Sequence, residues 1–73
     1  MAEREAKEIV LRRYSKAICK EARRFRSLPI WEVWASPECW ATEEMMLGEG
    51  RTEKAAWEDA AAALRARAQE TPR

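Results

Sequence analysis

The segment Ile-Trp-Glu-Val-Trp-Ala at residues 30–35 constrains the fold most, because it is rich in β-forming residues and has a proline close to each end. A single strand of this length needs a second strand to satisfy its backbone hydrogen-bonding groups. Residues 44–49 are the nearest segment that can provide one. We therefore predict a short β-hairpin of residues 30–35 and 44–49 within an α+β fold.

The stretch between these two segments leaves an alternative open. Ser36-Pro37-Glu38 is a good helix start, with serine as the cap and proline in the first turn. Residues 41–47 are mostly good helix formers, and Gly48 could end such a helix. A helix at residues 37–47 would make the chain an all-α protein of three helices.

Helices are expected on both sides of the hairpin. Residues 3–25 predict an N-terminal amphipathic helix, which should end before Pro29 because a residue preceding proline avoids helical geometry. Gly48-Glu49-Gly50 predicts a flexible joint, and Thr52 then caps a C-terminal helix at residues 53–68 that is rich in alanine. The apolar stripe of the first helix consists of Val10, Leu11, Tyr14, Ala17, Ile18, Ala22 and Phe25.

The length of 73 residues predicts one small domain, residues 1–73, with a frayed tail from about residue 69. No stretch of about twenty apolar residues predicts a membrane span, and the charged N-terminus does not resemble a signal peptide. We therefore expect a cytoplasmic protein, in which Cys19 and Cys39 are reduced thiols.

Charge is strongly separated along the chain. Residues 1–26 contain nine Lys or Arg and four Glu, whereas residues 27–73 contain five Lys or Arg and nine Asp or Glu. On a continuous N-terminal helix, the spacing of three and four would place six cations on one face. These six residues are Arg12, Arg13, Lys16, Lys20, Arg23 and Arg24.

Residues suited to catalysis or metal binding are scarce. The chain has no histidine, which removes the usual proton shuttle and every Ser-His or Cys-His pair. Two cysteines twenty positions apart do not match zinc-ligand spacing, and Gly48-x-Gly50 is too short for a phosphate-binding loop. We expect no enzymatic activity, no cofactor and no metal.

Two features predict a binding surface. The cationic stripe is either a solvated helix face or a contact for phosphates or an acidic protein surface. Trp31 and Trp34 fall on opposite faces of the predicted strand, so one of them should be exposed beside an open strand edge and act as a binding anchor. The predicted partner-binding residues are Arg12, Arg13, Lys16, Lys20, Arg23, Arg24, Trp31 and Trp34.

The segment Gly48-Glu49-Gly50-Arg51-Thr52 precedes an alanine-rich helix that contains Trp57, Glu58 and Asp59. Together with the chain length and the separated charge, this segment resembles small phage-encoded proteins that take over host functions, in particular the antiterminators that bind bacterial RNA polymerase. The resemblance implies host RNA polymerase as the partner and steric occupation near the sigma factor and the RNA exit path as the mechanism. It transfers no functional residue to this chain.

The sequence thus predicts a non-catalytic regulator of transcription that binds bacterial RNA polymerase and inhibits initiation, prevents termination, or does both. It would act in the host cytoplasm. Two alternatives remain: a nucleic-acid-binding protein that uses the basic N-terminal helix, or an inhibitor of another host defence protein.

Overall fold

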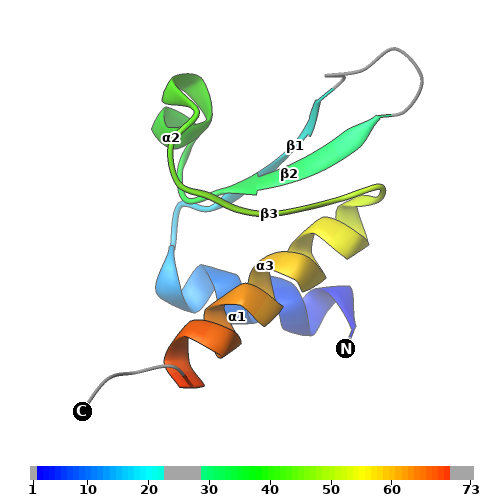
Figure 1. The fold of residues 1–73 in the computed structure, drawn as a ribbon, viewed down its shortest axis with the longest axis vertical. Coiled ribbons are helices and arrows are strands. Elements are labelled where there is room, and N and C mark those ends of the chain that lie inside the picture. Colours follow the sequence, from blue (N-terminus) through cyan, green and yellow to red (C-terminus); the bar gives the residue numbers. More distant parts are fainter. Residues whose placement is uncertain (1, 23–28, 70–73) are drawn as a thin grey trace.

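The computed structural model describes residues 2–22 and 29–69 and shows an α+β fold (Figure 1). Three strands form an antiparallel sheet in the order β1-β2-β3, with β2 in the centre. The predicted arrangement of an N-terminal helix, a hairpin and a C-terminal helix is confirmed, and the sheet has one strand more than predicted. The strands are β1 (Ile18–Ala22), β2 (Ile30–Trp34) and β3 (Met46–Gly50).

Three helices accompany the sheet: α1 (Glu3–Arg13), α2 (Pro37–Thr42) and α3 (Glu53–Gln69). The two predicted caps are present, because the amide of Cys39 donates to Ser36 Oγ at 3.2 Å and the amide of Ala55 donates to Thr52 Oγ1 at 3.0 Å. The sequence left open whether residues 37–47 form a helix or contribute to a hairpin strand. The structure shows a short helix at Pro37–Thr42 and the start of β3 at Met46. The predicted frayed tail falls mainly on residues 70–73, which lie outside the described residues.

The predicted helix at residues 3–25 is wrong at residues 14–22, and its last three residues, 23–25, lie outside the described residues. Tyr14 adopts extended backbone angles (φ −128°, ψ 90°) and ends α1. After a turn at residues 15–16 the chain enters β1, which pairs with β2 along its whole length. A strand such as β2 has backbone N–H and C=O groups along both of its edges. β1 provides the hydrogen-bonding partners along one edge. This tertiary demand outweighs the helix propensity of residues 18–22.

The register of the sheet assigns each side chain of β2 to a face. Val33 lies opposite Cys19 and Gly48, whereas Glu32 lies opposite Lys20 and Glu49. The pairing with β3 shifts between Val33 and Trp34, which is the signature of a β-bulge.

α1 and α3 lie side by side on one face of the sheet, and α2 lies on the other side (Figure 1). The face that carries Val33 packs against the two helices, and we call it the inner face. Most of the core side chains are small, so α3 approaches the sheet closely. The core consists of Ala6, Val10, Val33, Ala56, Trp57, Ala60 and Ala61.

Within residues 2–22 and 29–69, no helix is both long enough and apolar enough to cross a membrane.

Candidate functional site

The six predicted cations do not form one helix face. Arg12 and Arg13 lie in the last turn of α1, Lys16 lies in the following turn, and Lys20 lies in β1. All four side chains are exposed. The predicted continuous stripe is therefore wrong, because the helix that would have carried it ends at residue 13. The remaining two cations, Arg23 and Arg24, lie outside the described residues.

Arg13 lies instead beside two arginines that the sequence reasoning did not select. The C-terminal ends of α1 and α3 meet at one end of the molecule and enclose a hollow of about 260 Å³. Apolar, aromatic and cationic side chains line it, and no carboxylate is among the described lining residues. We call it the arginine hollow; its lining residues are Ile9, Arg13, Tyr14, Leu64, Arg65 and Arg67.

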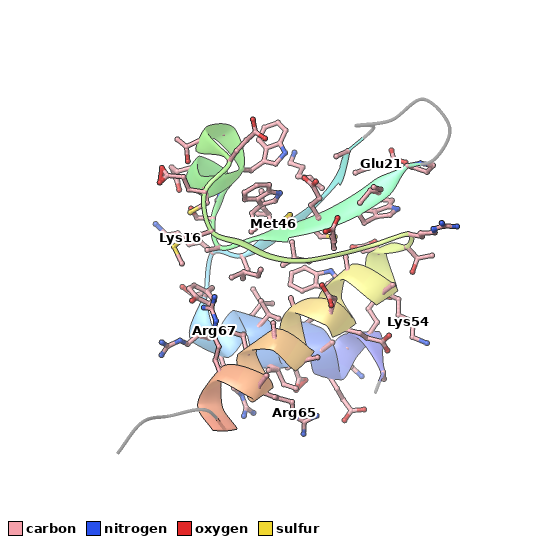
Figure 2. The ribbon with its side chains drawn as sticks, in the orientation of Figure 1. Lys16, Glu21, Met46, Lys54, Arg65 and Arg67 are labelled. Atoms are coloured by element: carbon pink, nitrogen blue, oxygen red, sulfur yellow. The ribbon has the colours of Figure 1, made fainter. Side chains whose placement is uncertain are left out.

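The cations around the arginine hollow are not neutralised within the described part of the chain. No ion pair there involves Arg13, Arg65 or Arg67, and the guanidinium of Arg13 lies 6.0 Å from the ring centre of Tyr14. Lys16 and Arg67 lie on the left side of the molecule in Figure 2, whereas Lys54 lies on the right, near the start of α3. Basic residues near a helix C-terminus interact favourably with the helix dipole, so part of this cluster stabilises α1 and α3 themselves.

The two tryptophans of β2 are not the exposed anchors that we expected. Trp34 is only 2% exposed, and Trp31 is half-buried against the core. Trp34 Nε1 donates a hydrogen bond to Glu32 Oε1 at 3.2 Å, and Glu32 is also 2% exposed. The expectation of an exposed tryptophan on this strand is therefore wrong, since both faces of β2 are covered. A direct role of Trp31 in partner binding stays a prediction.

The exposed tryptophan is Trp40, which the sequence reasoning did not single out. It belongs to α2 and is 44% exposed. The ammonium group of Lys20 lies 5.1 Å from the centre of its ring, so one ring face carries a cation–π contact. Met45, which precedes β3, and Met46, the first residue of β3, are 52% and 42% exposed. We call Trp40, Met45 and Met46 the apolar patch.

The segment that carries the apolar patch is held in place by short-range hydrogen bonds. The amide of Ala35 donates to the Met45 carbonyl at 3.3 Å and closes the segment at its base. The amide of Glu44 donates to the Cys39 carbonyl at 3.0 Å, after Glu43 has turned the chain with a left-handed backbone. Met45 is also left-handed, with φ 61°, a conformation that non-glycine residues adopt rarely and at a cost. The surrounding bonds keep Met45 in this conformation.

Cys19 does not resemble a reactive cysteine. It packs against the core, and burial raises the pKa of its thiol from 9.0 to about 11. The negative charges of Glu53 and Glu3 act in the same direction, and Lys7 opposes them. A thiol with this pKa is protonated at neutral pH and is a poor nucleophile.

The described residues contain no group of three or more His, Cys, Asp or Glu side chains that could hold a metal ion.

The structure shows a small α+β fold with two surface features on opposite sides of its sheet, the arginine hollow and the apolar patch. No family model, no curated protein and no solved structure matches the chain.

Proposed function

We propose that the chain is a non-catalytic binding module that docks onto a protein partner through the apolar patch. The observation that carries this proposal is the joint exposure of Trp40, Met45 and Met46, which lie in the stretch from α2 to the first residue of β3. A tryptophan and two methionines exposed in one segment can offer a large, adaptable apolar contact area, and exposed tryptophan is typical of binding hot spots.

The backbone around the apolar patch supports the same proposal. The hydrogen bond from Ala35 to Met45 and the serine cap of α2 hold the patch in one conformation before any partner arrives. Pre-organisation lowers the entropy that is lost on binding, so a small contact area can still give useful affinity. The strained backbone of Met45 also fits a functional role, because such strain tends to occur at functional sites.

The charge around the patch indicates the chemistry of the partner. Glu38 and Glu44 are exposed in the same segment, and Lys20 of β1 places its ammonium group over the Trp40 ring. The matching surface is an apolar pocket or groove whose rim carries basic groups for Glu38 and Glu44 and an acidic group for Lys20, because opposite charges at the rim speed up association and exclude wrong partners. A protein surface can combine apolar area with both charges, whereas a nucleic acid backbone offers negative charge alone.

Bacterial RNA polymerase is the partner that we propose to test first, with inhibition of initiation or antitermination as the result of binding. Its support is the resemblance of the length, charge separation and glycine-rich segment to small phage-encoded regulators. The absence of histidine from the chain supports a role by occupation of a surface and not by catalysis.

The test is a direct titration of the labelled chain with purified bacterial RNA polymerase, as core enzyme and with sigma factor. The wild-type chain should bind, and the Trp40→Ser, Met46→Ser double variant should bind at least about tenfold more weakly, as expected for a lost hot spot. Leu11→Ser is the matched control, since Leu11 is exposed on α1 away from the patch.

Two results would count against the proposal in different ways. If the wild-type chain does not bind polymerase, the choice of partner is wrong. If it binds but the double variant binds equally well while remaining folded by circular dichroism, the apolar patch is not the contact surface. In vitro transcription with the same variants then tells inhibition from antitermination.

A further inference from the structure

The arginine hollow lies on the inner side of the sheet, where α1 and α3 end, and the apolar patch lies on the other side. We propose that the hollow and the cations beside it bind the phosphate backbone of a nucleic acid. This inference is independent of the proposed protein contact, because the two surfaces share no residue.

The chemistry of the hollow favours an anion. Three arginines line it, and none is paired with a carboxylate within the described residues. A guanidinium group donates two parallel hydrogen bonds to a phosphate or a carboxylate and remains charged at every physiological pH. The negative ends of two helix dipoles account for one or two basic residues at this position. Arg13, Arg65 and Arg67 together exceed that need, and Lys16 adds a further cation outside both helices.

The arrangement favours a polymer of phosphates over a single anion. The hollow of about 260 Å³ is large enough for one anionic group with part of the unit that carries it. Arg12 directly precedes Arg13, and Lys16 follows it by three positions; both side chains are exposed but do not line the hollow, so a single group bound in the hollow would not pair with them. A nucleic-acid backbone repeats its negative charge at regular intervals and can reach cations inside and beside the hollow together. Tyr14 and the apolar side chains Ile9 and Leu64 can contact the sugars.

The experiment measures the binding of the full chain to fluorescent single-stranded RNA, double-stranded RNA and double-stranded DNA, each about 20 nucleotides or base pairs long, at about 50 and 200 mM salt. The test variant carries Arg13→Gln, Arg65→Gln and Arg67→Gln. The matched control carries Arg4→Gln, Arg51→Gln and Lys54→Gln, which removes the same charge from exposed positions away from the hollow. Glutamine is used because it removes the charge without adding a negative charge at a helix C-terminus.

We expect wild-type binding to at least one probe and a loss of about tenfold or more at low salt for the test variant. The slope of log K against log salt should fall by roughly 0.7–0.9 for each phosphate contact that is lost. The control variant should lose less than about threefold, because it changes only the overall charge.

Three outcomes would overturn the proposal. The first is no binding of the wild-type chain to any probe at low salt. The second is an equal loss of affinity in the test and control variants, which would assign binding to net charge and not to the hollow. The third is equally tight binding of polyglutamate of similar length, which would assign the hollow to acidic proteins. The Trp40→Ser, Met46→Ser variant should bind the probes like the wild-type chain, so a failure here is distinguishable from a failure of the proposed protein contact.

Discussion

The backbone of Gly48 in β3 lies directly against the backbone of Ala60 in α3. A Cβ atom at Gly48 would come within 2.7 Å of Ala60 Cα and within 2.9 Å of the Ala56 carbonyl oxygen. Gly50 meets Ala55 in the same way. The predicted flexible joint at residues 48–50 is therefore wrong, because these glycines form part of a strand and permit a close approach of sheet and helix.

Replacing Gly48 by alanine should destabilise the protein strongly. The new methyl group would meet backbone atoms of α3, which cannot rotate away as a side chain could. We expect a loss of about 3 kcal/mol in the free energy of unfolding, measured by urea titration. Glu49→Ala is the control and should cost less than about 0.5 kcal/mol, because this side chain is exposed. Equal stability of the two variants would show that α3 moves away from β3 easily.

The sequence predicted those elements whose signals are local. The strand at residues 30–34 followed from its β-branched and aromatic residues, and both helix starts followed from Ser36 and Thr52. The missed strand β1 has a physical reason. Ile18 and Ala22 are four residues apart, a spacing that places them on one face of a helix and also on one face of a strand. Pairing with β2 stabilises the strand over the helix, and this long-range pairing cannot be seen in the local sequence pattern.

The candidate site was less predictable, because it depends on where the elements meet. Arg13 was selected from the sequence, but Arg65 and Arg67 joined it only through the packing of α3 beside α1. The burial of Trp34 depends on elements that pack against β2 from other parts of the chain, including α2. The exposure of Trp40 had one local signal, since the serine cap and Pro37 place it on a short helix that cannot bury all its sides.

The thiol of Cys19 should make stability depend on pH in the alkaline range. Its pKa is raised from 9.0 to about 11 in the folded protein, mainly by burial. The folded state therefore retains the proton when the unfolded state has lost it, so this contribution to stability is complete below pH 9 and is lost as the pH rises toward 11. Urea titrations across this range should show a shallower decline for Cys19→Ala than for Cys39→Ala. Parallel declines for both variants would contradict the assignment.

The amide of Glu49 should be unusually protected from hydrogen exchange for an exposed edge strand. It donates to Asp59 Oδ2 at 3.0 Å, so α3 covers this point of the β3 edge. Asp59→Ala should increase the exchange rate of the Glu49 amide by about tenfold, as expected from the loss of roughly 1–2 kcal/mol of local hydrogen bonding to a charged acceptor. The amide of Val33 in the central strand should be unaffected. Rapid exchange at Glu49 in the wild-type chain would mean that this bond is not formed in solution.

Met45→Gly should separate partner binding from stability. Glycine adopts φ 61° without the steric cost that Met45 bears, although it also increases the entropy of the unfolded chain. These effects oppose each other, so the free energy of unfolding should remain the same or rise by up to about 1 kcal/mol. The variant nevertheless loses one of the three side chains of the apolar patch, so its affinity for the protein partner should fall.

Met46→Gly is the matched control for this prediction, because Met46 lies in β3 and has no left-handed backbone to relieve. It should lose both affinity and about 1 kcal/mol of stability, since glycine weakens a strand. Urea titration gives the stability of both variants, and titration with the partner gives their affinity. A Met45→Gly protein that is clearly less stable than the wild type would mean that the methionine side chain contributes packing that outweighs its backbone strain. A stable Met45→Gly protein with unchanged affinity would remove Met45 from the contact surface and leave Trp40 and Met46 to carry it.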